Sequence, residues 1–260
     1  MSIDTVRIVA HRGGAALGPE NTLPAFEASA RAGVTEVETD IRLSRDGRPV
    51  LLHDPTLERT TDGHGPVEDH DLAHLLTLDA GARWYASRGR GGEAGGGGRP
   101  AARLLGLRGL FEAFGSAFVY HLDFKAGGAD VAEAAMREVR RAHVEERTYV
   151  TGYNLEQLLA AKAIVGEVRV GWTISAEAGT ATADALVEAA GRGACEVAVH
   201  CDDITPALLE AAVAHGVAVR AFGLATPADA RRALARGATA LTLDDPRVEW
   251  LGAGLGLRGA

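Results

Sequence analysis

Short apolar segments alternate with helix-forming segments along most of the chain, and this alternation restricts the fold more than any other feature. A short apolar run bounded by turn residues is typical of a buried strand, and a helical pattern after each run is typical of βα units. The expected strands lie at residues 6–10, 36–43, 117–124, 148–151, 168–174, 194–200, 217–222 and 240–243. Because about eight such units in 260 residues match the usual size of a closed barrel, we predict an α/β fold of the (β/α)8 TIM-barrel type. An open, doubly wound sheet is the alternative.

One irregular segment, at residues 55–103, interrupts this alternation after the second strand and its return arm. A short helix is expected within it at residues 72–78. The glycine-rich stretch at residues 87–100 is expected to form a flexible, partly disordered loop. No linker divides the chain, so we expect a single domain over residues 1–260 with a small insertion at about 55–103.

Overall charge and hydropathy argue against two classes of partner. A net charge of −8 and an isoelectric point of about 5.6 are the opposite of the basic footprint of a nucleic-acid-binding protein. No apolar run approaches the roughly 20 residues of a membrane span. The first residues lack the basic and apolar regions of a signal peptide, so we expect a cytoplasmic protein. The sequence does not indicate the oligomeric state.

The expected strand at residues 36–43 carries acidic side chains on one of its two faces. In an extended chain, Glu36, Glu38 and Asp40 point to the same side, and a tight turn and a short apolar run then lead to His53. Neighbouring like charges repel each other, and a hard divalent cation would offset this repulsion because Mg²⁺ and Ca²⁺ prefer oxygen ligands. The alternative is an edge strand with surface ion pairs and a surface histidine.

Other polar residues also follow the expected strands, at the carboxyl ends where a TIM barrel forms its active site. The polar residues at these ends are His11, Arg12, Glu38, Asp40, His53, His121, Asp123 and Lys125. Charged side chains inside a barrel are unusual unless they are paired or bound to metal, so we predict that this set forms one site. For His121, a hydrogen-bonding role in the barrel lining is an equal alternative.

The loop after the first strand contains two further polar residues, Glu20 and Asn21. Asn21 and Thr22 both suit the N-cap of the helix that ends at Gly33, and we predict a capping role for Asn21. Glu20 fits a role in supporting the predicted site and a structural role in the loop equally well.

A series of short motifs over residues 6–65 resembles the glycerophosphodiester phosphodiesterase family. The motifs, in order, are His11-Arg12-Gly13, Pro19-Glu20-Asn21-Thr22, Glu38-x-Asp40, Asp46-Gly47, His53-Asp54 and Thr60-Thr61-x-Gly63. The resemblance continues more thinly through residues 121–125 and 216–246. It implies a metal-dependent TIM barrel that cleaves glycerophosphodiesters, as its small-molecule substrates, to glycerol 3-phosphate and an alcohol.

The resemblance also implies roles for the histidines and the cations. His11 matches the general base of the family and His53 its general acid, and Arg12 and Lys125 match residues that hold the phosphate. This assignment agrees with the chemistry, because two imidazoles with a pKa near neutral can serve as base and acid around one phosphorus. Arginine can pair with a phosphate through two hydrogen bonds, and lysine adds a point charge.

The same resemblance assigns a set of metal ligands and a pocket wall, and two of these positions depart from the family pattern. Glu38 and Asp40 match two metal ligands, and Asp123 stands where the family usually has Glu, so it is one methylene shorter. The cofactor would be Mg²⁺ or Ca²⁺, between which the sequence does not choose. Phe222 is expected to form a wall of the substrate pocket, although the family's Trp-Thr-Val-Asn is replaced by Phe222-Gly223-Leu224-Ala225. In the family, the insertion lies over the active-site mouth and helps to select the substrate.

Two other functions remain as alternatives. A phosphodiester lyase on the same barrel would form a cyclic phosphate, with the attacking hydroxyl supplied by the substrate itself. A non-catalytic barrel that binds a metabolite is the weaker alternative, raised by Asp123 and by the missing polar residues after Phe222. The sequence does not identify the alcohol that is released.

Overall fold

A closed barrel of parallel strands forms the centre of the protein. The computed structural model describes residues 6–89, 101–125 and 128–247, so most of the predicted glycine-rich loop, at residues 90–100, lies outside the described residues. The barrel strands are β1 (Arg7–Ala10), β2 (Glu36–Leu43), β4 (Val119–Phe124), β5 (Thr148–Gly152), β6 (Arg169–Ile174), β7 (Ala194–His200), β8 (Ala218–Phe222) and β9 (Ala240–Leu243). Each strand pairs with its neighbour in parallel, and β1 pairs with both β2 and β9, which closes the sheet. The predicted TIM barrel is therefore confirmed.

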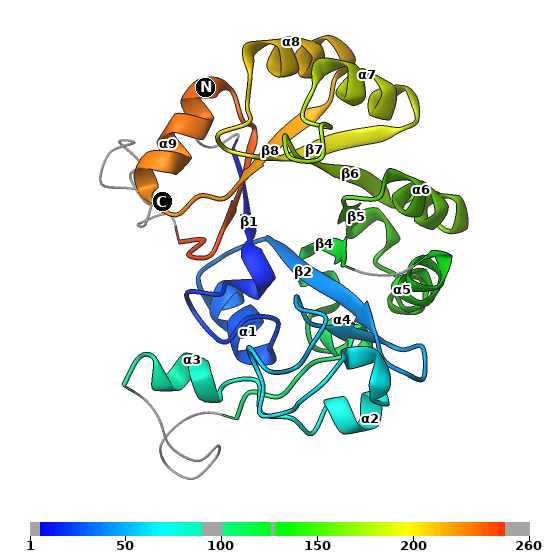
Figure 1. Cartoon of the computed structure of the whole chain (residues 1–260), viewed down its shortest axis with the longest axis vertical. Helices are drawn as coiled ribbons and strands as arrows, with labels where there is room; N and C mark the ends of the chain where they lie inside the picture. Colours follow the sequence, from blue (N-terminus) through cyan, green and yellow to red (C-terminus); the bar gives the residue numbers. More distant parts are fainter. Residues whose placement is uncertain (1–5, 90–100, 126–127, 248–260) are drawn as a thin grey trace.

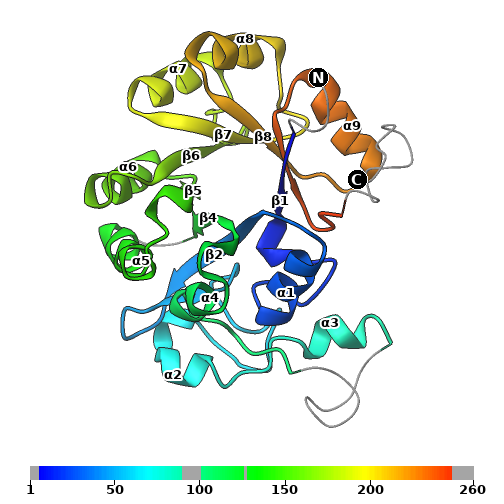
Figure 2. The same ribbon diagram turned by 180° about the vertical axis from the view of Figure 1, so that it is seen from behind.

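Helices between the strands cover the outer face of the barrel. They are α1 (Leu23–Arg31), α4 (Leu107–Phe114), α5 (Ala129–Ala142), α6 (Leu155–Ile164), α7 (Ala183–Gly191), α8 (Pro206–His215) and α9 (Pro227–Arg236). Figure 1 shows these helices in a ring around the strands, and Figure 2 shows the same ring from behind. Local signals set their ends: the Thr205 side chain accepts from the Leu208 N–H at the start of α8, and Gly216 ends the helix in the left-handed conformation.

The alternation of side chains along each strand separates the hydrophobic core from the barrel interior. On β2, Val37 and Ile41 pack into the main core, which lies between the barrel and its helices. Two of the three residues between them, Glu38 and Asp40, are almost completely buried without belonging to that core. This is the arrangement that the period of two predicts, and it directs the two carboxylates into the barrel.

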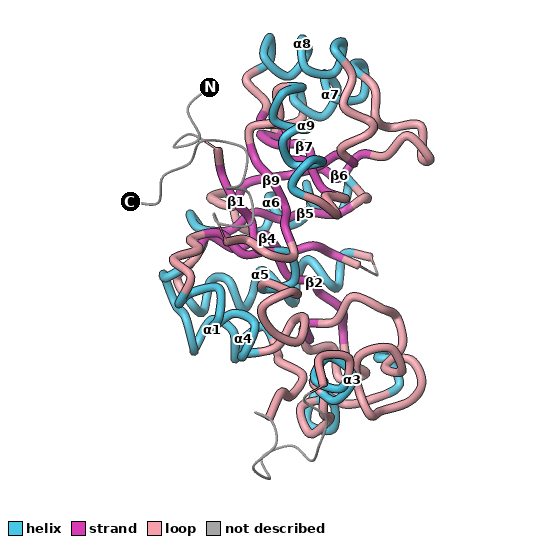
Figure 3. The backbone as a smooth tube through the Cα atoms, turned by 90° about the vertical axis from the view of Figure 1, so that its left-hand side faces the viewer, coloured by secondary structure: helices cyan, strands magenta, loops and turns pink. Residues whose placement is uncertain are grey.

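The segment between β2 and α4 has a hydrophobic cluster of its own. It begins with β3 (Pro49–Leu51), which pairs antiparallel with β2, and continues through α2 (Leu72–Leu75) and α3 (Ala82–Ala86). The cluster consists of Val50, Leu52, Leu57, Val67, Leu75, Leu78, Ala80 and Leu104. In Figure 3, α3 and its neighbouring loops lie at the opposite end of the molecule from α7 and α8. The helix expected at residues 72–78 covers only its first turn, and α3 was not predicted. Within the described ranges, none of the helices combines the length and the hydropathy of a transmembrane segment.

Candidate functional site

The turn after β1 places His11 and Arg12 at the carboxyl end of the barrel. Residues His11–Gly13 form a short 3-10 helix, in which Arg12 adopts a φ of 52°, an uncommon value for a residue other than glycine. Gly13 has a φ of 77°, and a Cβ there would lie 2.8 Å from the Phe26 ring. The backbone N–H of Arg12 donates to Glu38 Oε2 over 2.8 Å, which fixes this turn against β2.

Three carboxylates gather inside the barrel mouth. Asp40 on β2 and Asp123 on β4 are partners in the strand register, and ligand oxygens of Glu38, Asp40 and Asp123 all lie within 4.8 Å of one another. Burial and the nearby charge of Asp40 raise the pKa of Glu38 to about 7. Three acids held this close, in a site shielded from water, need positive charge if all of them are to be ionised.

Two cations supply part of that charge. Lys125 Nζ lies 2.7 Å from Asp123 Oδ2 and 3.2 Å from Asp40 Oδ1, and Arg12 Nε lies 3.6 Å from Asp40 Oδ2. Burial alone would raise the pKa of Asp40, but Lys125 and Arg12 lower it below its usual value. Among the described residues, Asp123 Oδ1 is buried without a hydrogen-bond partner.

The chemistry of this set fits a divalent metal ion. Its donors are all carboxylate oxygens, and among the described residues Asp40 Oδ1 and Asp123 Oδ1 are buried without a hydrogen bond. Hard cations such as Mg²⁺ and Ca²⁺ take ligands of this type. Asp123 is one methylene shorter than the expected glutamate, but its carboxylate still lies beside those of Glu38 and Asp40.

Each of the two predicted catalytic histidines has a carboxylate on its Nδ1. His11 Nδ1 lies 2.6 Å from Asp244 Oδ1, just after β9, and His53 Nδ1 lies 2.7 Å from Asp54 Oδ1. Because a carboxylate only accepts hydrogen bonds, Nδ1 carries the proton in both rings and Nε2 is left for a substrate. Arg59 from the insertion binds Asp54 through Nε, 2.6 Å from Oδ2, and holds it in place.

The two histidines differ in their pKa shifts. Burial lowers the pKa of His11, but the hydrogen bond to Asp244 and the charge of Glu38 outweigh burial and raise it. Burial lowers the pKa of His53, and the carboxylates of Asp40 and Asp54 do not fully compensate. The difference shows that the two rings lie in different electrostatic environments within one cavity.

Asn21 has a different role from the one predicted. Thr22, and not Asn21, occupies the N-cap position of α1. Asn21 is buried with a φ of 59°, and its amide donates to Asp40 Oδ2 over 2.7 Å while its carbonyl accepts from the Thr39 hydroxyl. The capping prediction was wrong because local sequence does not reveal that the side chain turns toward β2.

Glu20 contacts two arginines near the site. Its Oε1 accepts from Arg12 Nη1 over 2.8 Å, and both of its oxygens accept from Arg59. Glu20 therefore connects the turn after β1 to the insertion. Of the two roles left open by the sequence, these contacts favour support of the site.

His121 and Glu36 lie apart from the site, although both were grouped with its residues on the sequence pattern. His121 is fully buried, and its Nε2 lies 2.9 Å from Glu36 Oε2. Glu36 also accepts from Arg7 Nε over 2.9 Å. Neither residue lines the cavity at the barrel mouth, so the alternative of a barrel-lining hydrogen bond holds for His121.

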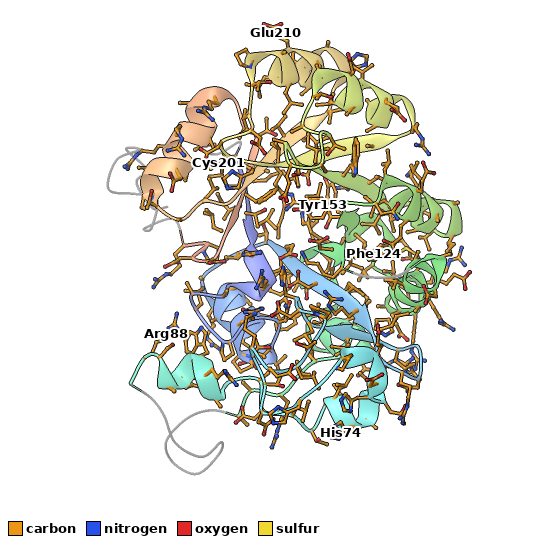
Figure 4. All side chains as sticks on the ribbon, in the orientation of Figure 1. His74, Arg88, Phe124, Tyr153, Cys201 and Glu210 are labelled. Carbon is orange, nitrogen blue, oxygen red and sulfur yellow. The ribbon has the colours of Figure 1, made fainter. Side chains whose placement is uncertain are left out.

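A cavity of about 430 Å³ connects the predicted residues. The predicted site residues that line it are His11, Arg12, Glu38, His53, Asp123, Lys125 and Phe222. Asp40 is fully buried and lies behind this surface. Asp244, Tyr153, Thr173, Arg220 and Thr242 also line the cavity and were not predicted. In Figure 4, Tyr153 is labelled near the middle of the ring of helices. The one signal for Asp244 and Thr242 in the sequence was their position at the carboxyl end of the last strand.

Known proteins resemble this chain in sequence and in fold. The model of the glycerophosphoryl diester phosphodiesterase family matches residues 11–99. A glycerophosphodiester phosphodiesterase of Caldanaerobacter subterraneus is 28% identical over 247 residues, which cover 92% of this chain and 94% of that protein. One from Bacillus subtilis is 39% identical over 85 residues, which are 29% of its length.

Two solved structures show the same fold over nearly the whole chain. One is from Silicibacter pomeroyi and is described as a glycerophosphoryl diester phosphodiesterase. It has a TM-score of 0.84 at 24% identity, and the match covers 98% of this chain and 96% of that chain. A phosphodiesterase of Oleispira antarctica, in complex with the product sn-glycerol-3-phosphate, has a TM-score of 0.79 at 24% identity and covers 93% of this chain and 94% of its own.

Proposed function

We infer that this chain is a member of the glycerophosphoryl diester phosphodiesterase family and that it hydrolyses glycerophosphodiesters to glycerol 3-phosphate and an alcohol. The observation that carries this inference is one cavity that contains two carboxylate-backed imidazoles, two cations and a carboxylate cluster. Such a set can bind an anionic diester and transfer protons on either side of its phosphorus. The product bound to the Oleispira antarctica relative supports the same substrate class.

His11 is proposed as the general base and His53 as the general acid. The bond to Asp244 orients His11 and makes its Nε2 a stronger base toward water, while the lower pKa of His53 makes its imidazolium a stronger acid toward the leaving alkoxide. Asp54, held by Arg59, orients His53 in the same way. Positioned acids and bases of this kind contribute about 10²- to 10⁴-fold each.

Glu38, Asp40 and Asp123 are proposed to hold one divalent metal ion, either Mg²⁺ or Ca²⁺. When bound there, the ion would supply Lewis-acid stabilisation of the negative charge on the phosphoryl oxygens in the transition state. It would also offset the charge of Glu38, one of the two anions that raise the pKa of His11, and would lower that pKa toward its ordinary value.

Arg12 and Lys125 are proposed to bind the phosphate, and Phe222 to form part of the pocket wall. Both cations line the cavity and are held by carboxylates, Arg12 by Glu20 and Lys125 by Asp123. A guanidinium and an ammonium fixed before the substrate arrives stabilise its negative charge without reorganisation.

The segment at about 55–103 is proposed to act as an insertion of a single domain that spans residues 1–260, next to the active-site mouth. Its hydrophobic cluster and the contacts of Arg59 with Asp54 and Glu20 support this proposal. Through Arg59, the insertion would set the position of the catalytic acid.

A panel of glycerophosphodiesters tests the proposed function. The protein is incubated with each diester in Mg²⁺, in Ca²⁺ and in chelator, and glycerol 3-phosphate is measured by a coupled enzyme assay. We expect turnover with metal and a loss of at least about 100-fold in chelator. Phosphorus NMR of the product separates hydrolysis from the lyase alternative, because a lyase would release a cyclic phosphate. No turnover of any diester with either metal would contradict the proposal.

A further inference from the structure

A second polar patch lines the same cavity away from the carboxylate cluster. It consists of Thr173 on β6, Arg220 on β8 and Thr242 on β9, which are 7%, 3% and 6% exposed. None of these residues is used in the proposed hydrolysis. Polar side chains buried in a barrel need partners, so the patch requires an explanation.

Arg220 is fixed in one orientation but retains a free donor. Its Nε donates to Glu196 Oε1 and its Nη1 donates to Thr242 Oγ1, both over 2.7 Å. Among the described residues, Nη2 of Arg220 makes no hydrogen bond, and neither does the hydroxyl of Thr173. Two residues that line the cavity therefore each have a polar group, a guanidinium nitrogen and a hydroxyl, that is free to bind a ligand.

Small residues on β6 and β7 leave room for the Glu196 and Arg220 side chains and for a ligand beside them. Glu196, on the strand between those of Thr173 and Arg220, is fully buried. A Cβ on Gly171, its register partner on β6, would lie 3.2 Å from Glu196 Oε1. Ala198, which also lines the cavity, is the register partner of Arg220. Larger side chains at Gly171 or Ala198 would fill the room beside the patch.

The charges around the patch balance one another. Glu196 pairs with Arg220 over 2.7 Å and with Arg7 over 3.0 Å, and Arg7 also pairs with Glu36. Two arginines thus face two glutamates, and burial lowers the pKa of the adjacent His121. The patch therefore offers hydrogen bonds without a net charge.

This combination suits neutral hydroxyl groups and not an ammonium group. A hydroxyl can accept from Arg220 Nη2 and exchange a hydrogen bond with Thr173. An ammonium ion would face the guanidinium and find no carboxylate within the patch to compensate it, which is costly in a buried site. Phe222 and Leu224 line the cavity beyond the patch and add apolar surface.

We propose that Thr173, Arg220 and Thr242 bind the alcohol part of the diester and select alcohols with several neutral hydroxyl groups, such as glycerol or inositol, over choline and ethanolamine. This proposal rests on the proposed function. Loss of a buried hydrogen bond to a substrate hydroxyl commonly lowers kcat/KM by about tenfold or more, so the selection is measurable.

The test compares kcat/KM for four diesters of glycerol 3-phosphate, with glycerol, inositol, choline and ethanolamine as the alcohols. We expect the wild type to favour the first two by about tenfold or more, and Thr173→Val and Arg220→Lys to remove most of that preference. Thr151→Val is the matched control, because its buried hydroxyl has no partner either but lies outside the cavity lining. It is expected to keep the wild-type ratio. Ratios between substrates are unaffected by partial unfolding of a variant.

Two results would overturn the proposal: equal or better turnover of the choline diester by the wild type, or an equal loss on all four diesters in the variants. The second result would mean that the patch binds the glycerol half common to all of them. If no diester is turned over, the proposed function fails, and calorimetric binding of the inositol and choline diesters to wild type and Thr173→Val still decides the preference.

Discussion

Replacement of Glu38 by glutamine should stabilise the metal-free protein at alkaline pH while it removes metal binding. Burial and Asp40 raise the pKa of Glu38 to about 7, so the folded state binds a proton that the unfolded chain, with a pKa of 4.5, has already lost. Stability therefore falls as the pH rises between these two values, and the loss is complete above the higher one. The amide of the Glu38→Gln variant does not titrate, and its oxygen can still accept from the Arg12 N–H.

The size of this effect follows from the two pKa values. With about 1.4 kcal/mol per pH unit, ionisation of Glu38 costs about 1 kcal/mol of folding free energy at pH 5 and about 3 kcal/mol at pH 8. For a protein of this size, 1 kcal/mol corresponds to roughly 2–4 °C in Tm. The advantage of Glu38→Gln over the wild type should thus grow by about 4–8 °C from pH 5 to pH 8.

Differential scanning fluorimetry in chelator, at pH 5 and at pH 8, measures how the Tm difference between Glu38→Gln and the wild type changes with pH. Glu36→Gln, two residues away on the same face of β2, is the control. Although burial would raise the pKa of Glu36, His121 and Arg7 lower it to about 2, so it is ionised at both pH values and its replacement should lower Tm similarly at each. Added Mg²⁺ or Ca²⁺ should raise the Tm of the wild type and leave that of Glu38→Gln unchanged. An advantage of Glu38→Gln that is equal at pH 5 and pH 8, or absent at pH 8, would refute the reasoning.

Four further variants test the site. His11→Ala and His53→Ala should each lower kcat by about 10²- to 10⁴-fold in the glycerol 3-phosphate assay while calorimetry still detects metal binding, and near-full turnover by either would exclude that histidine. Asp244→Asn removes an anion that raises the pKa of His11, so the acidic limb of the kcat/KM profile should move to lower pH; an unmoved limb would mean that His11 is not the base. Asn21→Ala leaves the buried Asp40 without its amide donor and should lower the free energy of unfolding by about 2 kcal/mol in a denaturant titration. No change there would mean that water replaces the amide.

Local signals in the sequence were sufficient for the barrel and for the carboxylates of β2. The helix α8 begins after Thr205 and ends before Gly216 because capping is decided within a few residues. Glu38 and Asp40 share a face because strand alternation is equally local. By contrast, α3 lies in a segment without regular spacing, and Trp84 within it donates to the Ala15 carbonyl, 69 positions away in the chain.

The remaining parts of the site depend on contacts that no local pattern reveals. Asp244 meets His11 across 233 positions, and this pairing exists only because β9 closes the barrel against β1. Asn21 resembles a cap in sequence, whereas the fold turns its side chain to Asp40. Arg220 was invisible because an arginine in an otherwise apolar strand has no recognisable role until its partner Glu196, on the adjacent strand, is placed beside it.

The balanced charges beneath the cavity also constrain how this enzyme can evolve. Arg7, Glu36, Glu196 and Arg220 come from four different strands and neutralise one another inside the barrel. A single replacement would leave one buried ion without its partner and lower the folding stability by roughly 3–5 kcal/mol. Replacement of a whole ion pair by apolar residues can leave the stability nearly unchanged. Mutations at these positions should therefore show strong epistasis, and lineages that lose Arg220 should lose Glu196 with it.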